Sequence, residues 1–417
     1  MVIIRRKLYY LIQDHLQNKE ITLITGPRQA GKTTLMKQLE GLLKRKGEKT
    51  LFLDLDKEQD RPFFDSQARL IQRIQYELGE ESGYVFIDEI QRKENAGLFL
   101  KGIYDMDLPY KFIVSGSGSL ELKEKIHESL AGRKRVFKLS TLSFEEFVNF
   151  KTEGKHTAEF FDLYKELALQ YLEEYLNFGG YPKVVLETKA SQKQANIDEI
   201  YRSYLEKDIS FFLNIQKTER LTHLVRVLAS QTGNMVNISE LSNTIGIAVQ
   251  TIKDYLWYLE KTFIVQRVTP YFKNIRKEIV KASTYYFMDL GLKNYAVNQF
   301  GNALGTPSVG LLFENFIYNS LKERIYLSSA TIHFWRSKDK AEVDFVINTG
   351  HSLIPVEVKY SHLEKPQTSR SFKSFLEKYK PQKAYIVHLG EYMEGKFNES
   401  KIYYIPFFKT EIITKNI

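Results

Sequence analysis

A short run of residues near the N-terminus has spacing that is typical of phosphate binding. Residues 26–33 read GPRQAGKT and match the pattern G-x-x-x-x-G-K-[ST]. Glycines allow a tight loop whose backbone N–H groups converge on phosphate oxygens. In this pattern Lys32 reaches the β- and γ-phosphates and the Thr33 hydroxyl binds Mg²⁺, which predicts a site for ATP or ADP. The residues expected around the nucleotide are Gly26, Pro27, Arg28, Gln29, Ala30, Gly31, Lys32, Thr33 and Thr34.

Two acidic residues follow a buried strand downstream of this loop. Residues 84–87 read YVFI, and Asp88 and Glu89 come directly after them. An acidic residue at the end of a buried parallel strand holds the magnesium ion of the nucleotide, directly or through water, so we expect this role for Asp88. The neighbouring Glu89 is expected to polarise the water that attacks the γ-phosphate.

Two further polar positions are candidates for contact with the γ-phosphate. Residues 110–120 read YKFIVSGSGSL, a strand that ends in serines, and we choose Ser117 with Ser115 as the alternative. Arg133 lies in a loop before a later strand and is a candidate for stabilising transition-state charge, in its own subunit or from a neighbouring one. The competing interpretations are a serine–glycine turn and a solvated basic loop.

A second set of chemically active residues lies near the C-terminus. Residues 341–361 read AEVDFVINTGHSLIPVEVKYS, two alternating strands that carry Asp344, Glu357 and Lys359. Side chains on a strand repeat with period two, so Glu357 and Lys359 share one face. Carboxylates on adjacent strands make an oxygen site for Mg²⁺ or Mn²⁺, to which Glu314 can add a third oxygen from the preceding helix. With Lys359 orienting water or stabilising the phosphate, the set predicts phosphodiester hydrolysis.

The elements that position both sets follow an α/β pattern. The run ITLIT before the loop is a strand, and the residues after the loop have the apolar spacing of a helix, which is the context that the phosphate pattern requires. After residue 308 the pattern predicts a helix, three strands, a second helix and a fourth strand. These elements cover residues 309–324, 331–336, 341–348, 352–361, 369–379 and 383–390.

The middle of the chain has a helical segment and a basic segment. Residues from about 155 to 215 read as helical, and Arg202 is the arginine there that could face the nucleotide. Residues 237–272 look like a helix-turn-helix, with Ser239 as a helix cap, and a basic β-hairpin wing follows. Packing between domains is the competing interpretation. The candidate DNA contacts are Gln250, Thr251 and Lys253 in the groove and Lys273, Arg276 and Lys277 on phosphates.

Several of these motifs together resemble a family of prokaryotic AAA-type ATPases. They are GPRQAGKTTL, VFIDEIQ, SGSGSL followed by LAGRKRVFKLSTLSFEEF, and NFGGYP. The resemblance implies an αβα ATPase core, an α-helical lid, a winged helix and a C-terminal domain similar to PD-(D/E)XK nucleases. In that nuclease core the element order is α-β-β-β-α-β, with Asp on the second strand and E-x-K on the third. This chain departs from the pattern at Val343, which stands where the proline would be.

Length and composition set the outer limits. At 417 residues we expect about two to four domains, with a composition of 43% hydrophobic residues that supports packed cores. The chain has no cysteine, which excludes disulfides and thiolate zinc sites and fits the cytoplasm, and it has no apolar run long enough to span a membrane. A net charge of +9 favours a phosphate-rich partner such as DNA. The expected parts are the ATPase core over residues 1–152, the lid over 153–216, the winged helix and wing over 217–304, and the PD-(D/E)XK-like α/β domain over 305–417.

The sequence thus predicts a protein that binds and hydrolyses ATP and acts on DNA, with a metal-dependent endonuclease domain at its C-terminus. The DNA preference that the resemblance implies is a branched structure, and a homo-oligomer is compatible with an AAA-type core. The alternative is a nucleotide-dependent switch whose C-terminal domain docks DNA or a protein partner without cleavage. Strong salt-dependent DNA binding would count against a switch that docks only protein, because counterion release follows phosphate contact.

Overall fold

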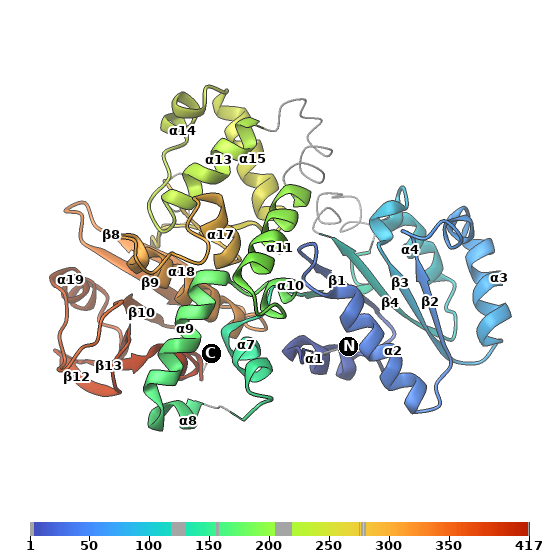
Figure 1. The fold of residues 1–417 in the computed structure, drawn as a ribbon, viewed down its shortest axis with the longest axis horizontal. Helices are drawn as coiled ribbons and strands as arrows, with labels where there is room; N and C mark the ends of the chain where they lie inside the picture. The colour runs from blue at the N-terminus through green and yellow to red at the C-terminus, as the bar shows by residue number, and fades with distance from the viewer. Residues whose placement is uncertain are drawn as a thin grey trace.

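The computed structural model describes residues 4–117, 130–155, 158–204, 219–274, 276, 278, 281–415 and 417. Two lobes are apparent in Figure 1, one built from the first third of the chain and one from the rest. We call residues 4–138 the N-terminal lobe and residues 142–417 the C-terminal lobe. The turn 139–141 connects them.

The N-terminal lobe has a five-stranded parallel sheet with the strand order β2-β3-β4-β1-β5. Its strands are β1 (Ile21–Gly26), β2 (Thr50–Asp54), β3 (Gly83–Asp88), β4 (Tyr110–Ser117) and β5 (Lys134–Lys138). Its helices are α1 (Lys7–His15), α2 (Lys32–Arg45), α3 (Gln67–Leu78) and α4 (Ala96–Asp105), with short 3₁₀ turns at Arg61–Phe64 and Ile90–Arg92. This sheet confirms the expected α/β core.

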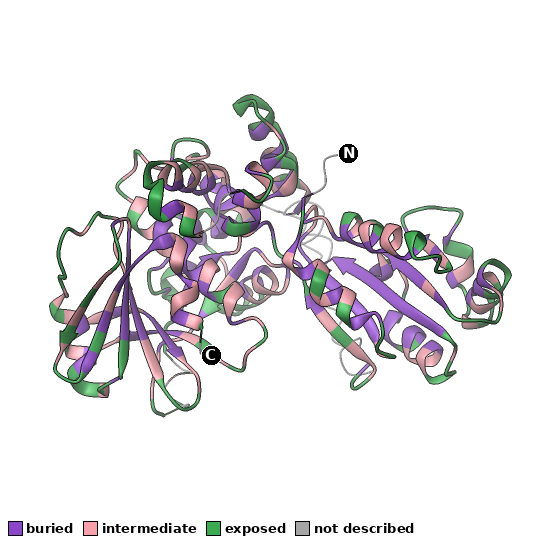
Figure 2. Ribbon diagram, turned by 90° about the horizontal axis from the view of Figure 1, so that it is seen from below, coloured by how far each residue is buried: buried purple, intermediate pink, exposed green. Residues whose placement is uncertain are grey.

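Alternation along the strands divides the N-terminal lobe into three layers. Ile24 and Phe86 pack with α1 and α2 on one face, whereas Leu23 and Val85 pack with α3 and α4 on the other. Parallel strands that are buried on both faces read as continuous apolar runs, which is why ITLIT and YVFI were recognisable as strands. In Figure 2 the buried colour dominates the middle of this sheet, where β1, β3 and β4 lie, whereas β2 and β5 at its edges also have half-buried or exposed positions.

The middle of the chain is mostly helical. Its helices are α7 (Phe144–Lys151), α8 (Ala158–Leu163), α9 (Lys165–Phe178), α10 (Pro182–Val185), α11 (Ala190–Arg202), α13 (Glu219–Ser230), α14 (Ile238–Ile245), α15 (Val249–Lys261) and α17 (Leu290–Ala296). Strands β6 (Val265–Val268) and β7 (Thr284–Phe287) form a separate antiparallel pair. Asn237, and not the expected Ser239, caps α14, because its side-chain oxygen accepts the Ser239 and Glu240 N–H groups.

A six-stranded mixed sheet with the order β12-β13-β11-β10-β9-β8 forms the rest of the C-terminal lobe. The expected elements are present as α18 (Val309–Arg324), β8 (Thr331–Arg336), β9 (Glu342–Asn348), β10 (Leu353–Val358), α19 (Arg370–Tyr379) and β11 (Lys383–His388). Two strands that the sequence analysis did not assign extend the sheet, and a 3₁₀ turn and a short helix follow. They are β12 (Met393–Phe397), β13 (Ser400–Pro406), Phe407–Lys409 and α20 (Glu411–Thr414).

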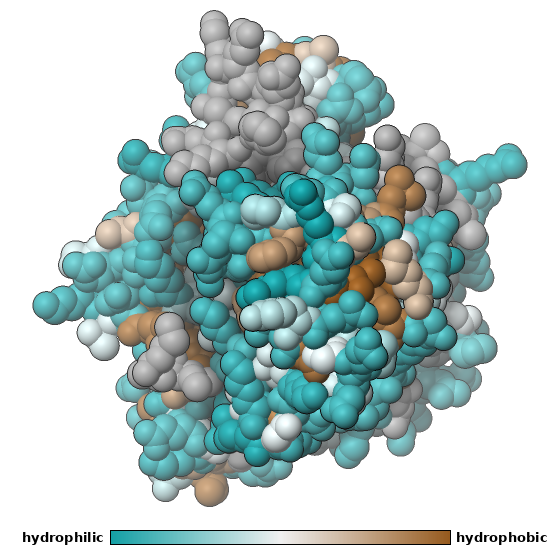
Figure 3. Space-filling view, turned by 90° about the vertical axis from the view of Figure 1, so that its right-hand side faces the viewer, coloured by the Kyte–Doolittle hydropathy of each residue, from teal (hydrophilic) through white to brown (hydrophobic). Residues whose placement is uncertain are grey.

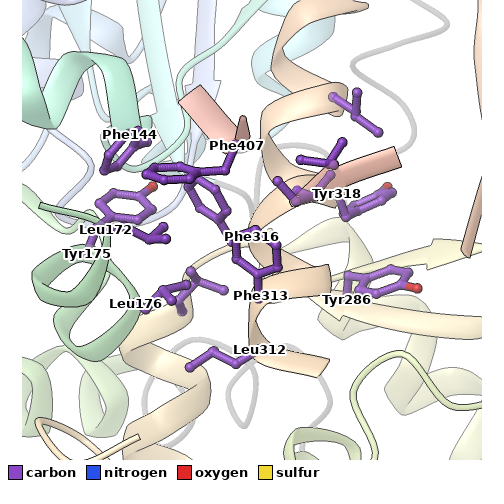
Figure 4. Packing of buried hydrophobic residues seen from close by; sticks show 14 of the residues in the cluster. Phe144, Leu172, Tyr175, Leu176, Tyr286, Leu312, Phe313, Phe316, Tyr318 and Phe407 are labelled. Atoms are coloured by element: carbon purple, nitrogen blue, oxygen red, sulfur yellow. The ribbon is translucent and has the colours of Figure 1, made fainter. Parts of the chain in front are cut away.

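The largest hydrophobic core crosses the expected domain boundaries. Phe144 from α7 and Tyr175 from α9 pack against Phe316 of α18, with ring centroids 5.4 Å apart for Phe144 and Phe316. Phe407, near the C-terminus, completes this aromatic cluster, and Tyr286 of β7 belongs to the same core (Figure 4). The lid-like helices, the β6–β7 pair and the C-terminal sheet therefore share one core.

The basic segment after β6 is only partly a free wing. Residues Thr269 and Tyr271 exchange backbone hydrogen bonds with Phe334, so this stretch adds to the edge of β8. Lys273 and Arg276 are exposed beyond it, and Lys277 lies outside the described residues. The expected antiparallel hairpin is present as the β6–β7 pair, and the stretch after β6 is attached in addition to the edge of β8, where backbone groups are open to pairing.

Within the described residues, no helix is both long and apolar enough to cross a membrane. Seen from the end of the N-terminal lobe, the surface is mostly hydrophilic, with smaller hydrophobic areas (Figure 3). Large apolar side chains that are exposed on this lobe include Tyr76 of α3, Leu98 of α4 and Met106 just after it. They are spread over separate elements.

Candidate functional site

The loop between β1 and α2 has backbone geometry that only certain residues adopt easily. Gly26 ends β1, and a Cβ atom at this position would lie 2.0 Å from the Leu139 carbonyl oxygen. Gly31 caps α2 with a φ of +96°, in the left-handed region that favours glycine. The two glycines of the pattern are therefore required by a close approach and by a backbone angle. The N-terminus of α2 opens toward the space enclosed by the loop, as anion-binding helix termini do.

Lys32, Thr33 and Asp88 meet at this loop. The Lys32 ammonium is buried and donates to the carbonyl oxygens of Gly26 at 3.1 Å and Pro27 at 2.8 Å. The Thr33 hydroxyl donates to Asp88 Oδ2 at 2.6 Å. Because β1 and β3 are parallel and flank β4, their carboxyl ends meet at one edge of the sheet, which brings the loop and Asp88 together.

A second layer of contacts holds the acidic residues in place. The Ser115 hydroxyl and the Glu89 N–H both donate to Asp88 Oδ1. Glu89 has a φ of +56°, which is uncommon for a residue with a side chain, and its carboxylate accepts from the Gln91 amide. The Gln91 side-chain oxygen in turn accepts the Ser117 N–H at 3.2 Å. Burial raises the pKa of Glu89, against the opposing effect of the Lys32 charge.

Gln91 is a residue that the sequence analysis missed. It stands two positions after Glu89, in the 3₁₀ turn, and is 9% exposed. The only signal was its place directly after the acidic pair, since the contact with Ser117 joins two different strand ends. Ser115 contacts Asp88 through its hydroxyl, whereas the described contact of Ser117 is made by its backbone.

This donor set fits a nucleotide with magnesium. An ammonium and a helix N-terminus suit phosphate oxygens, and a hydroxyl beside a carboxylate suits Mg²⁺. The Lys32 ammonium is buried and held by two loop carbonyls, so the loop keeps a positive charge against its own backbone. Lys32, Thr33, Asp88 and Glu89 are thus the residues that would hold the ligand and its metal.

Arg133 lies at the other end of the sheet. Its carbonyl oxygen accepts the N–H of Ile21, the first residue of β1, whereas the loop follows the last residue of that strand. Its guanidinium pairs with Asp105 at 2.6 Å. This placement separates Arg133 from the loop of its own chain by the length of β1, so a role within its own subunit does not fit, and the role toward a neighbouring subunit and the solvated basic loop stay predictions.

The arginine of the expected lid, Arg202, has its described ion pair within its own helix. Arg202 is exposed and pairs with Asp198 of the same helix at 2.8 Å. The contact that reaches the loop comes from Tyr204 instead, whose hydroxyl accepts the Arg28 N–H at 3.0 Å and donates to the Thr262 carbonyl at 2.8 Å. Thr262 follows α15, so this hydroxyl joins the loop to the helix that carries Gln250 and Lys253.

The C-terminal carboxylates lie in one region but bind other groups. Lys359 Nζ lies 2.7 Å from Glu357 Oε1, and the Ser369 hydroxyl donates to Glu357 Oε2 at 3.1 Å. Asp344 Oδ2 accepts the Val358 N–H at 2.7 Å. Ser369 was not anticipated, because its role as the cap of α19 gave no hint of this contact.

A side chain of the β6–β7 pair contacts Glu314, a contact that the sequence did not indicate. The Tyr286 hydroxyl donates to Glu314 Oε1 at 2.5 Å. Burial, and then the charge of Asp344, raise the pKa of Glu314 well above its usual range. Burial likewise raises the pKa of Asp344 to about 7. Burial acts to lower the pKa of Lys359, but the charge and hydrogen bond of Glu357, together with the charges of Asp344 and Glu314, outweigh it and the pKa is raised.

The described residues do not form the expected metal site in this arrangement. Among them, no three histidine, aspartate or glutamate side chains are grouped so that they could hold a metal ion. The contacts of the three predicted ligands are instead with Tyr286, with a backbone N–H and with Lys359. No reaction step through a metal is therefore derived for this cluster.

Comparison with known proteins divides the chain into three matched regions. Residues 18–148 match the family model described as an AAA domain. This match and the loop geometry support an AAA-type P-loop ATPase. Residues 169–303 and 309–408 match two models described as domains of unknown function, DUF8612 and DUF4143.

Similar full-length proteins occur in bacteria and archaea. An uncharacterized protein of Haemophilus influenzae is 25% identical over 92% of this chain and 93% of its own length. One from Mycobacterium tuberculosis is 26% identical over 94% and 81%, and one from Methanocaldococcus jannaschii is 24% identical over 87% and 80%. The matches cover both lobes, so the two lobes occur together in these proteins.

Solved structures resemble the chain only distantly. The Aeropyrum pernix ORC1 protein in complex with DNA has a TM-score of 0.30 at 14% identity, covering 73% of this chain and 95% of that one. The replication initiator DnaA bound to AMPPCP and single-stranded DNA has a TM-score of 0.29 at 14% identity, covering 62% and 90%. Similarity at this level does not establish a shared function.

Proposed function

We propose that the protein binds and hydrolyses ATP at the β1–α2 loop and uses the nucleotide cycle to act on DNA. The observation that carries the first part is the meeting of Lys32, Thr33 and Asp88 at the carboxyl edge of the parallel sheet. An ammonium, a hydroxyl and a carboxylate in this arrangement match what a nucleoside triphosphate with magnesium requires. The AAA-domain match over residues 18–148 supports the same reading.

Each residue of the nucleotide site has a separate task in this proposal. Lys32 leaves the loop carbonyls to neutralise charge on the β- and γ-phosphates, and Asp88 and Thr33 hold the metal. Bound magnesium supplies neutralisation of the charge that develops on the phosphates. Glu89, with a pKa raised by burial, orients and deprotonates the attacking water. Gln91 holds the Glu89 carboxylate, and Ser115 or Ser117 contacts the γ-phosphate side of the site.

Action on DNA is supported by charge and by the α14–α15 pair. The net charge is +9, and Lys253 lies exposed on α15 while Lys273 and Arg276 are exposed beyond β6. Basic side chains on a helix-turn-helix and its neighbour suit a phosphate backbone. Tyr204, which touches both the loop and the end of α15, gives a route from nucleotide to this surface.

Two activities are candidates for the C-terminal cluster. Metal-dependent DNA cleavage is supported by Asp344 and Glu357 on adjacent strands with Lys359 beside them. Docking of DNA or of a protein partner without cleavage is favoured by the engaged carboxylates and by the lack of a metal-binding group among the described residues. A neighbouring copy of the chain, reached by Arg133, is a further proposed partner.

The test measures ATP turnover and DNA cleavage in the same preparations. Wild type should hydrolyse ATP, and Lys32→Ala and Glu89→Gln should each lower turnover by about 100-fold. Lys37→Ala is the matched control, because this exposed lysine lies on the same helix. Equal turnover in wild type and Lys32→Ala would refute hydrolysis at this loop.

Cleavage is assayed on end-labelled linear, single-stranded and branched DNA with Mg²⁺ or Mn²⁺, with and without ATP. Cleavage that is lost in Asp344→Ala would establish the nuclease, and its dependence on Lys32 would show whether ATP controls it. Salt-dependent DNA binding without cleavage would establish docking. Absence of any DNA binding would refute action on DNA.

A further inference from the structure

Arg6, just before α1, places its guanidinium against the nucleotide loop. The side chain is 6% exposed, and its Nη1 donates to the Ala30 carbonyl oxygen at 2.9 Å. Its Nη2 donates to the carbonyl oxygens of Ser140 at 2.7 Å and Thr141 at 3.3 Å in the turn between the lobes. Its Nε lies 3.0 Å from Glu146 of α7. One buried cation therefore joins the N-terminal segment, the loop, the turn and α7.

The contact with Ala30 has a direct consequence for the loop. The Ala30 carbonyl and the Gly31 N–H belong to one planar trans peptide unit, so they point in opposite directions. A donor that holds the carbonyl on one side turns the Gly31 N–H to the other side. Gly31 caps α2, and its N–H is one of the amides at this terminus that have no partner within the helix. A cation on the carbonyl also polarises the peptide and strengthens its N–H as a donor.

Glu146 fixes the guanidinium in this position. Its Oε1 accepts the Lys7 N–H at 2.7 Å, and its Oε2 accepts the Ser143 N–H at 3.1 Å in addition to Arg6. Both charged side chains of the Arg6–Glu146 pair are only 7% exposed. A buried ion pair is weak evidence for stability, since apolar residues of similar size usually serve as well. Its specific effect here is to orient Arg6 toward the Ala30 carbonyl.

We propose that Arg6 is a positioning residue for nucleotide phosphate binding, which acts by holding the Ala30–Gly31 peptide with its N–H toward the phosphates. The inference rests on the proposed nucleotide site and adds to it a residue that lies outside the G-x-x-x-x-G-K-[ST] pattern. It also explains how the segment before α1 and residues 140–147, which read STLSFEEF, contribute to the geometry of the loop.

The first measurement compares the affinity for ADP with magnesium in three variants. Arg6→Gln keeps a polar side chain but removes the guanidinium, and we expect it to weaken ADP binding by about tenfold, the loss typical of one charge-assisted hydrogen bond. Arg5→Gln is the matched control, because it removes the same charge from the exposed neighbour. Glu146→Gln still accepts from Arg6 Nε, so its affinity should stay within about threefold of wild type. If Arg6 only stabilised α7, Arg6→Gln and Glu146→Gln would behave alike.

The second measurement observes the loop amide itself. Labelling with ¹³C-carbonyl alanine and ¹⁵N-glycine selects glycines that follow alanine, which are Gly31, Gly97 and Gly132. In wild type, ADP should move the Gly31 amide proton downfield, with the other two signals as internal controls. In Arg6→Gln this shift should shrink. A change in fold alone would move the control signals in the absence of ADP.

The outcomes separate this inference from the proposed function. If wild type and Lys32→Ala bind ADP equally, the nucleotide site itself is wrong. If only Lys32→Ala loses ADP, and Arg6→Gln matches Arg5→Gln in affinity and shift, the site stands and the role of Arg6 is refuted. Should Arg6→Gln fail to fold, Arg6→Met with Glu146→Leu removes both buried charges together. Wild-type affinity in that double variant would refute the inference as well.

Discussion

Asp88 in the N-terminal lobe and Asp344 in the C-terminal lobe both occupy buried strands, yet their surroundings differ. Asp88 accepts from the Thr33 and Ser115 hydroxyls, which can exchange for a metal or its water. Asp344 is held by a backbone N–H of the next strand, and its neighbour Glu357 is paired with Lys359. The donors at the first site thus include two hydroxyls that can turn to a metal or its water, whereas the second site holds a buried carboxyl with one described backbone donor and a raised pKa.

The lobes also differ in how their cores are assembled. The two faces of the N-terminal sheet are covered by α1 to α4, all within the first 138 residues, and Tyr326 is the C-terminal side chain that packs against the α1–α2 face. The C-terminal core combines side chains from α7, α9, β7, α18, β13 and α20, and it also includes Ile4, which lies 409 residues before Ile413. Long-range assembly of this kind predicts that the elements of this core unfold together, while α11, α13, α14 and α15 pack in a second cluster.

The largest expected effect tests that cooperativity. Phe316 is 1% exposed at the centre of the aromatic cluster, so Phe316→Ala should lower the free energy of unfolding of the C-terminal lobe by about 3–5 kcal/mol. Calorimetry should show the whole C-terminal transition move to lower temperature while the N-terminal transition keeps its midpoint. Leu163→Ala, at a side chain that is 80% exposed, is the control.

A stable fragment of residues 305–417 with an unchanged midpoint would contradict the shared core. Calorimetry of that fragment would then favour the domain boundaries expected from the sequence.

Tyr286→Phe removes the hydroxyl that contacts Glu314 and should destabilise the C-terminal lobe by about 1–3 kcal/mol, because a buried carboxyl loses its donor. ATP turnover should not change, since the nucleotide site lies in the other lobe. Denaturant unfolding and a turnover assay measure both quantities. The exposed Tyr392→Phe serves as the control, and an equal loss of stability in the two variants would argue against the Glu314 contact.

Sequence reasoning succeeded where structure is local. The loop at residues 26–33 is bounded by its own strand and helix, so both the motif and its setting lie within about 25 residues. It failed where contacts join distant elements, as between Tyr286 and Glu314 or between Arg6 and Glu146, which are 140 positions apart. No periodicity or spacing encodes such pairs, because they depend on how the lobes pack.

Other differences have specific causes. Arg133 seemed placed for charge stabilisation because it precedes a strand, but the entry of β5 is the edge of the sheet opposite the loop. The basic stretch after β6 alternated like a wing, yet part of it pairs with β8. The strands β12 and β13 were missed, although the Met393–Phe397 strand alternates between half-buried and exposed positions as an edge strand does.

Gln91→Ala tests the carboxylate site of the N-terminal lobe. Without Gln91 the Glu89 carboxylate loses the amide that orients it, so we expect the turnover number to fall on the order of tenfold. The affinity for ATP should stay near that of wild type, because the described hydrogen bonds of the Gln91 side chain are with Glu89 and Ser117. Glu94→Ala, on the exposed side of the same turn, is the control. A loss of affinity with an unchanged turnover number would contradict this role.

The smallest expected effect concerns pH and belongs to the N-terminal lobe alone. Burial, together with the charges of Lys111 and Arg135, lowers the pKa of His15 to about 4. The side chain is 3% exposed, and its Nδ1 shares a hydrogen bond of 2.8 Å with Thr22. His15 binds a proton near pH 6.5 in the unfolded chain but only near pH 4 in the folded lobe. Its contribution to the free energy of unfolding is therefore complete above about pH 6.5 and is lost as the pH falls toward 4.

His15→Gln keeps a hydrogen-bonding side chain and removes the titration. The melting temperature of its N-terminal lobe should therefore fall less between pH 6.5 and pH 4.5 than that of wild type, whereas the C-terminal transition should follow the same pH curve in both proteins. His223→Gln, which changes a half-exposed histidine of the other lobe, is the matched control. If the melting temperature of the N-terminal lobe changes equally with pH in the two variants, His15 is not the group that sets this pH dependence. The separate unfolding of the lobes would then have to be established by Phe316→Ala alone.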